Sequence, residues 1–230
     1  MKNNKDQIVE PEHTAVRVAL WRALHIQIDS KPHIVYDDIG AKLIAEDNWQ
    51  ARPDMHPDFS KTMRASIVGR TRFVEDLLLE QIALGIDQYV ILGAGLDSFA
   101  QRRPKTASHL QIFEVDQPGP QTWKKNRLLE LGFDIPSSLH FVPTNFESEK
   151  SWWQTLIAHG FDKNKPAFIV STGVSMYLTK EALFATLRQI TQLPANSTFA
   201  MTFMLSLNLL EPNEKSIMEF VMKKAEQAHT

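Results

Sequence analysis

Short apolar runs alternate with longer amphipathic stretches over most of the chain. The apolar runs predict strands at residues 88–93, 110–115, 139–142, 167–171 and 197–204, and the stretches between them predict helices near 97–103, 119–131, 149–159 and 179–193. A short, continuous apolar run is typical of a strand that is buried on both faces of a parallel sheet. Strands that alternate with helical crossovers predict an α/β fold with a doubly wound, mainly parallel sheet.

A helical segment precedes the first predicted strand. Apolar residues recur every four positions in a helix that begins near Thr14, namely Val16, Leu20, Leu24 and Ile28. A second, short helix is predicted over Asp38 to Asp47, and residues 48–59 are predicted to be irregular. A third helix is predicted over residues 61–85, with Gly85 as its stop and an inner face of Ile67, Val74, Leu77, Leu78, Ile82 and Ala83.

These patterns divide the chain into three parts. Residues 1–86 form an N-terminal helical extension or lid, of which residues 1–13 are expected to pack loosely. Residues 87–205 form the α/β core, and residues 206–230 carry one polar helix at about Glu214 to Ala228. No strand signal follows the fifth predicted strand, which would therefore lie at an open edge that proteins normally cover. We expect on this ground that the chain is truncated.

Candidate chemistry begins where the first predicted strand runs into Gly93-Ala-Gly95. Glycine permits a sharp turn and leaves no Cβ between the backbone and a ligand. The second predicted strand is followed by Asp116, and an acid at this place can hydrogen-bond the ribose hydroxyls of a nucleoside. The dinucleotide motif has a third glycine where this chain has Ser98, and that glycine serves packing at a pyrophosphate site. The pattern therefore favours a nucleoside ligand without a pyrophosphate, such as S-adenosylmethionine.

Composition narrows the choice of partners. The formal net charge is −2 at pH 7, which gives no long-range attraction to nucleic acid or to an anionic membrane. No apolar run approaches the roughly 20 residues that span a bilayer, and the first ten residues lack the apolar stretch of a secretion signal, so we expect a cytoplasmic protein. The chain has no cysteine, and its eight histidines show no short spacing, so no disulfide and no metal site are predicted.

Four stretches between residues 60 and 205 share the pattern of one enzyme family. They are Gly69-Arg-Thr-Arg-Phe-Val-Glu-Asp76, Val90-Ile-Leu-Gly-Ala-Gly-Leu-Asp-Ser98, Phe113-Glu-Val-Asp-Gln-Pro118 and Ser171-Thr-Gly-Val-Ser-Met-Tyr-Leu178. Together they resemble the leucine carboxyl methyltransferase-like family of S-adenosylmethionine-dependent O-methyltransferases. The resemblance implies a Rossmann-like fold of the class I methyltransferase type and S-adenosyl-L-methionine as cofactor. It also implies methyl transfer to a carboxylate or hydroxyl oxygen of a small-molecule or peptide-carboxylate acceptor.

The resemblance assigns roles to five residues around the glycine turn. Arg70 would hold the methionine carboxylate, and Gly93 and Gly95 would pass under it. Asp97 would shape the loop and contact the amino-acid end of the cofactor. Aspartate after such a turn can equally cap the helix that follows. Asp116 would bind the ribose.

Three further positions complete the candidate site. After the third strand this chain has Asn145-Phe146 where many members of the family have Asp-Leu, and the Asn145 amide oxygen can accept a hydrogen bond from the adenine amino group. Thr172 stands where a Glu often opens the fourth-strand segment. Tyr177 lies close enough to the end of that strand for its hydroxyl to meet a substrate, although it could also be a core residue.

The sequence favours one acceptor class and leaves two other functions open. A carboxylate acceptor needs no general base, whereas a phenol or alcohol does, and no residue stands out as that base or as any other catalytic group. This favours an acid acceptor. An NAD-dependent oxidoreductase remains possible from the glycine turn and Asp116, and a non-catalytic nucleoside-binding module remains possible from Thr172 and the short C-terminus. The oligomeric state is not indicated.

Overall fold

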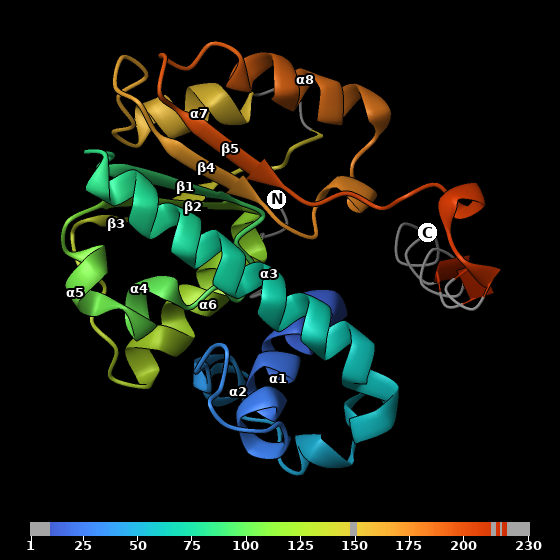
Figure 1. Ribbon diagram of the computed structural model, residues 1–230. Helices are drawn as coiled ribbons and strands as arrows, with labels where there is room; N and C mark the ends of the chain where they lie inside the picture. The colour runs from blue at the N-terminus through green and yellow to red at the C-terminus, as the bar shows by residue number, and fades with distance from the viewer. Residues whose placement is uncertain (1–9, 148–150, 213–214, 217, 220–230) are drawn as a thin grey trace, which may run out of the picture.

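A five-stranded parallel sheet forms the centre of the protein (Figure 1). The computed structural model describes residues 10–147, 151–212, 215–216 and 218–219. The strands are β1 (Gln88–Leu92), β2 (Gln111–Asp116), β3 (Leu139–Pro143), β4 (Phe168–Ser171) and β5 (Thr198–Met201). Their order is β3-β2-β1-β4-β5, and all neighbours are parallel. The predicted doubly wound α/β fold is therefore confirmed.

The strand order reverses beside β1. The chain places β2 and β3 on one side of β1, and then crosses back to place β4 and β5 on the other. Leu92, the last residue of β1, pairs with Val115 of β2 and with Ser171 of β4, so the segments after these strands begin at the same edge of the sheet. In open α/β sheets ligands bind at such a reversal, beyond the carboxyl ends of the strands.

Helices cover both faces of the sheet (Figure 1). They are α3 (Pro57–Ala83), α4 (Phe99–Arg102), α5 (Pro104–Ala107), α6 (Pro118–Glu130), α7 (Trp152–Ala158) and α8 (Lys180–Ile190). Successive residues of a strand point to opposite faces. Tyr89 and Ile91 of β1 join the core under α3, α4 and α5, whereas Val90 and Leu92 join the core under α7. All five residues of β1 are buried, which explains why its sequence shows no polar alternation.

The N-terminal helices pack beside the sheet rather than on it (Figure 1). They are α1 (His13–Ile28) and α2 (Ile39–Ile44), followed by the short 3-10 helices η1 (Trp49–Ala51) and η2 (Pro53–Met55). Leu20 and Leu24 of α1 pack with Met55 and with Ile67 of α3 in one apolar cluster. A second cluster joins α1 and α2 to Leu96 of the glycine turn and to α6. The helical extension is therefore packed directly against the turn.

Several predicted boundaries differ from the structure. The third helix begins at Pro57 instead of residue 61, because proline at a first helical position loses no backbone hydrogen bond. Ile28 is 42% exposed and Ala83 is also exposed, so neither belongs to the predicted inner faces. The helix predicted near 97–103 is present as the shorter α4, and a second short helix, α5, starts at Pro104.

The end of the chain differs as well. Strand β5 ends at Met201 instead of residue 204, and the short 3-10 helix η4 (Leu207–Leu209) follows it. The helix predicted at about Glu214 to Ala228 lies largely outside the described residues, as do residues 1–9.

An ion pair between β2 and α6 is almost completely buried. Glu114 of β2 and Lys124 of α6 approach to 2.5 Å, and each side chain is 1% exposed. Glu114 faces α6, as expected from its alternation with its strand neighbours, and Gln121 of α6 donates to the Glu114 carbonyl at 2.8 Å. Burial raises the pKa of Glu114 to about 7, against the opposing effect of Lys124. Removing one member of such a pair leaves an uncompensated charge, which costs more than the pair contributes.

We therefore expect Lys124→Met to lower the free energy of unfolding at pH 8 by about 3–5 kcal/mol, because it strands the Glu114 carboxylate. The double variant Glu114→Leu/Lys124→Met should recover most of this loss. The folded pKa of Glu114 lies above its ordinary value of 4.5, so the folded protein binds the extra proton and stability falls as pH rises from about 4.5 through 7. This decline should be absent from the double variant in urea titrations at several pH values. Equal losses in the single and double variants would contradict the coupling.

Candidate functional site

The turn after β1 requires glycine at two positions. Gly93 has a φ of 70° and Gly95 a φ of 51°, both in the left-handed region that side chains disfavour. The Gly93 and Ala94 amides donate to the Val115 carbonyl of β2 at 2.8 and 3.2 Å. These two hydrogen bonds hold the predicted glycine-rich turn against the end of β2.

The space beside these glycines is occupied by the protein itself. A Cβ on Gly93 would lie 2.3 Å from Cγ2 of Val174, and a Cβ on Gly95 would lie 3.4 Å from Cβ of Ala15 in α1. The sequence pattern predicts that a ligand approaches where these side chains are missing. At Gly93 the structure assigns the space to Val174, which follows β4, so the glycine there serves packing between the two central strands.

Asp116 lies at the carboxyl end of β2, beside the turn. Its carboxylate accepts hydrogen bonds from the Gly95 amide and, at 2.6 Å, from the Gln117 amide. Burial raises the pKa of Asp116, while these two amides and Lys124 oppose the rise. A carboxylate has about four lone-pair positions, so two amide donors leave acceptor capacity for hydroxyl groups. The predicted place of Asp116 beside the turn is confirmed, and its chemistry fits a ribose.

Arg70 lies on α3 and points its guanidinium at Gly173, the second residue after β4. A Cβ on Gly173, whose φ is 71°, would come within 3.1 Å of Nη2 of Arg70. The pKa of Arg70 is lowered to about 10, chiefly by burial and also by the nearby Arg22 guanidinium, while Tyr177 opposes the shift. Among the described residues no carboxylate lies within ion-pairing distance of Arg70. The result is a half-buried cation without a matching anion, at the same sheet edge as the turn.

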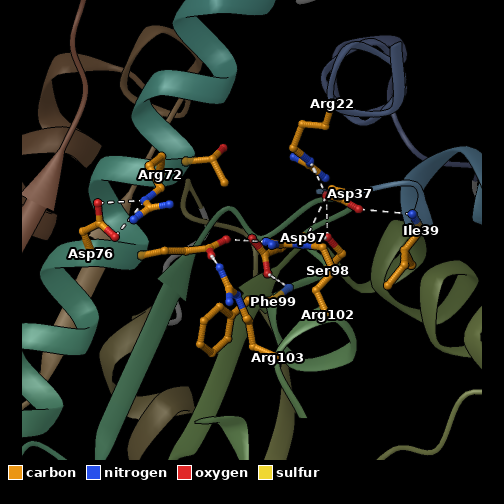
Figure 2. A network of polar contacts seen from close by, with 12 residues as sticks. Arg22, Asp37, Ile39, Arg72, Asp76, Asp97, Ser98, Phe99, Arg102 and Arg103 are labelled. Carbon is orange, nitrogen blue, oxygen red and sulfur yellow. Dashed lines mark hydrogen bonds and ion pairs between the residues drawn. The ribbon is translucent and has the colours of Figure 1, made fainter. Parts of the chain in front are cut away.

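The remaining predicted residues divide into two groups. The Asp97 carboxylate accepts from the Phe99 amide at 2.8 Å, so it caps the start of α4 (Figure 2). Asn145 is exposed, and its Oδ1 accepts from the Glu147 amide at 2.9 Å. Phe146 packs toward Trp152, with ring centroids 6.4 Å apart, and so belongs partly to the core. Each of these three side chains therefore already makes a local contact within the protein.

The second group follows β4. Thr172 is partly buried directly after the strand. Tyr177 ends the 3-10 helix η3 (Ser175–Tyr177), its amide donates to the Val174 carbonyl at 2.9 Å, and its phenol acts electrostatically on Arg70. The structure therefore brings Arg70 and Tyr177 together with the segment that covers Gly93.

Sequence reasoning missed a buried polar network next to the turn (Figure 2). Its members come from four separate segments and are Arg22, Asp37, Glu75, Ser98, Arg102 and Arg103. The dinucleotide motif identifies Ser98 only as a lost glycine. In the structure its side chain is buried and bonded on two sides. The spacing of 61 residues between Asp37 and Ser98 gives no local signal that could have revealed the contact.

Other kinds of site were sought in the described part of the chain. There, no group of three or more His, Cys, Asp or Glu residues could hold a metal ion. None of the helices in the described ranges has both the length and the apolar character needed to cross a membrane. An open hollow of about 410 Å³ lies away from the glycine turn and is lined by Ala23, Gln27, Asp38, Ala41, Lys42, Ala45, Glu46, Asp47 and Trp49. None of the candidate site residues lines this hollow, so the hollow is separate from the candidate site.

One family model and several curated relatives match the chain. The sequence model of Leucine carboxyl methyltransferase matches residues 15–191. A Bacillus subtilis (strain 168) protein, YktD, is 45% identical over 114 residues, covering 50% of this chain and 37% of that protein. A Mycobacterium sp. (strain JLS) protein is 38% identical over 135 residues, covering 58% and 43%. By name, both are assigned to the S-adenosyl-L-methionine-dependent methyltransferases. The chain thus matches less than half the length of these relatives.

Solved structures also resemble the chain at low sequence identity. A DUF574 family protein from Streptomyces avermitilis has a TM-score of 0.47 and 20% identity, covering 83% of this chain and 68% of that chain. The mitomycin 7-O-methyltransferase MmcR has a TM-score of 0.43 and 12% identity, covering 90% and 55%.

The packing of Val174 on Gly93 can be tested by comparing the cost of Gly93→Ala with that of the same substitution at Gly132, a glycine of similar backbone conformation. Gly132 has a φ of 76°, and a Cβ added to it would meet no atom within 4 Å, so Gly132→Ala should cost about 1–2 kcal/mol of unfolding free energy from backbone strain alone. Gly93→Ala should cost about 1–3 kcal/mol more, because Cγ2 of Val174 must move. In a Val174→Ala background the cost of Gly93→Ala should fall to that of Gly132→Ala. Urea unfolding of these variants measures the difference, and an unchanged cost in that background would refute the contact.

Proposed function

The chain belongs to the leucine carboxyl methyltransferase family, and we propose that it binds S-adenosyl-L-methionine at the glycine turn and supports methyl transfer to an acceptor oxygen. The acceptor would be a carboxylate or hydroxyl group of a small molecule or peptide. The names of the curated relatives support the cofactor and the reaction class.

The observation that supports this proposal most strongly is the guanidinium of Arg70, which has no carboxylate partner among the residues that the structure describes. A half-buried cation without an anion is costly unless a ligand supplies one. A guanidinium binds a carboxylate through two parallel hydrogen bonds, and the amino-acid end of the cofactor carries such a carboxylate. Asp116, on the other side of the turn, offers acceptor positions for ribose hydroxyls. The two side chains match the two ends of the same ligand.

The other predicted residues would complete the site. Gly93 and Gly95 would pass beneath the ligand, and Asp97 would support the loop from its capping position. Asn145 and Phe146 would lie at the adenine end, and Thr172 near the sulfonium. Residues 1–86 would act as a lid, because Ala15 of α1 already lies against Gly95.

The cofactor would supply a methyl group bonded to a positively charged sulfur. That sulfur is an effective leaving group. The protein would then mainly align the acceptor oxygen with that methyl group and exclude water from it. Tyr177 lies near Arg70 and would contact the acceptor. A carboxylate acceptor is already nucleophilic and needs no proton removed, which favours an acid over an alcohol.

The cofactor assignment can be tested with two arginines on the same helix. Arg70→Met should weaken binding of S-adenosylhomocysteine by about 10- to 100-fold, because a charge-assisted interaction with its carboxylate is lost. Binding of 5′-methylthioadenosine, which lacks that carboxylate, should change little. Arg72, two residues away, is exposed and pairs with Asp76 at 2.8 Å, so Arg72→Met is the matched control and should leave both affinities unchanged. Asp116→Asn should weaken both ligands, because both contain the ribose.

Calorimetric titration measures these affinities. If Arg70→Met weakened both ligands equally, the guanidinium would not face the carboxylate. If the unaltered protein bound NAD and not S-adenosylhomocysteine, the oxidoreductase alternative would replace the proposal.

The acceptor class requires a separate assay. With methyl-labelled S-adenosylmethionine and matched panels of carboxylic acids, phenols and alcohols, we expect label to appear in base-labile methyl esters. Labelling restricted to the hydroxyl acceptors would overturn the preference for an acid. Cofactor binding without transfer to any acceptor would favour the non-catalytic binding module.

A further inference from the structure

A buried ionic network joins the N-terminal helices to the glycine turn (Figure 2). We propose that Asp37 is a positioning residue, which acts through Arg22 and Ser98 to hold the turn at a fixed distance from Arg70. This inference rests on the proposed function, because it concerns how the same site is kept ready for its cofactor. Asp37 itself is not expected to touch the ligand.

The Asp37 carboxylate is the centre of the network. Its Oδ2 accepts from Nε of Arg22 at 2.6 Å and from the Ser98 hydroxyl at 2.6 Å, and its Oδ1 accepts from the Ile39 amide at 3.1 Å. The residue is 1% exposed. Nε of Arg102 lies 3.5 Å away and completes its surroundings. Hydrogen bonds to buried charges hold their partners firmly, because water cannot replace a lost partner.

The network holds the glycine turn on both sides of Asp97. Nη2 of Arg22 donates to the Leu96 carbonyl at 2.7 Å. The Ser98 hydroxyl donates to Asp37 and accepts from Nε of Arg102 at 2.9 Å. One carboxylate therefore controls the positions of both Leu96 and Ser98, through a backbone contact and a side-chain contact. A glycine at position 98, as in the dinucleotide motif, could not make the second contact.

The same network reaches the helix that carries Arg70. Nη2 of Arg102 pairs with Glu75 of α3 at 2.5 Å, and Arg103 pairs with the other Glu75 oxygen at 3.3 Å. Glu75 and Arg70 lie five residues apart on α3. The chain of contacts from Asp37 through Ser98 and Arg102 to Glu75 thus links the turn to α3. This link sets the distance between the turn and Arg70, which would bind the methionine carboxylate.

Each carboxylate of the network lies against arginine side chains. Burial raises the pKa of Asp37, but Arg22, Arg102 and the Ser98 hydroxyl more than offset this effect and lower it, so the carboxylate stays ionised. Arg102 lies between Asp37 and Glu75, and the pKa of Arg102 is raised, against burial, chiefly by Glu75. Neutralising Asp37 would leave the buried Arg22 guanidinium without its ion-pair partner, whereas Arg102 would keep Glu75. The turn would then lose its link to the N-terminal helices through Ser98 and Asp37, while the sheet would remain.

The test compares neighbouring aspartates. Asp37→Asn should weaken S-adenosylhomocysteine binding by about tenfold or more, because small displacements of positioned groups have large effects. The loss for 5′-methylthioadenosine should be smaller, because only the longer ligand must reach the turn and Arg70 together. Asp38→Asn is the matched control, since Asp38 is partly exposed and pairs with Lys42 at 2.7 Å, outside the network around Asp37. It should bind both ligands as the unaltered protein does.

Two further variants separate positioning from general loss of stability. Ser98→Ala removes only a hydroxyl, should fold, and should show the same preferential loss of S-adenosylhomocysteine binding together with faster hydrogen exchange at the Asp97 amide. Leu156→Ala creates a cavity in the core under α7, on the opposite face of the sheet from α4, and should lower stability without changing either affinity.

The outcomes distinguish this inference from the proposed function. Unchanged ligand affinities and unchanged amide exchange in Ser98→Ala and Asp37→Asn would overturn the positioning role. Should the unaltered protein bind no S-adenosylhomocysteine, the proposed function would fail, and exchange at the Asp97 amide would still decide whether the network holds the turn.

Discussion

The site depends on one buried carboxylate that has several partners. Asp37 comes from the loop between α1 and α2, yet its contacts reach Arg22 of α1 and Ser98 at the start of α4. Arg102 extends these contacts to Glu75 of α3. If one member of such a buried set is removed, a charge is left without a partner, and this destabilises the protein. The N-terminal helices, the glycine turn and α3 are therefore constrained as one assembly at the end of the sheet where the strand order reverses.

Much of the sheet could be predicted from the sequence because its signals are local. Each strand is a short apolar run buried on both faces, and the residues after β1, β2 and β4 meet at one edge because parallel strands end together. The same reasoning placed Asp116 beside the glycine turn. Boundaries were less certain where proline redefined them, as at Pro57 and Pro104.

The missed features all depend on contacts between distant segments. Nothing in the sequence near Ser98 indicates that Asp37 will meet it. The helices that bring these residues together pack through apolar surfaces, and the sequence does not show which apolar surfaces will meet. Gly93 shows the same limit. The sequence predicts that its missing side chain makes room for a ligand, and the structure adds that a Cβ at this position would meet Val174. Sequence patterns indicate that a backbone position must be glycine, but they do not identify the atom that requires it.

The contrast between the paired network and Arg70 separates two uses of buried charge. In the network, Arg22 and Arg102 each lie against a carboxylate, so its charges stabilise one another and fix the geometry. Arg70 lies close by without such a partner among the described residues, and burial lowers its pKa. A cation kept in this state lowers the stability of the free protein, and a ligand that supplies a carboxylate recovers that loss on binding. The paired charges thus constrain the frame around the turn, and we propose that the Arg70 charge within it binds the carboxylate of a ligand.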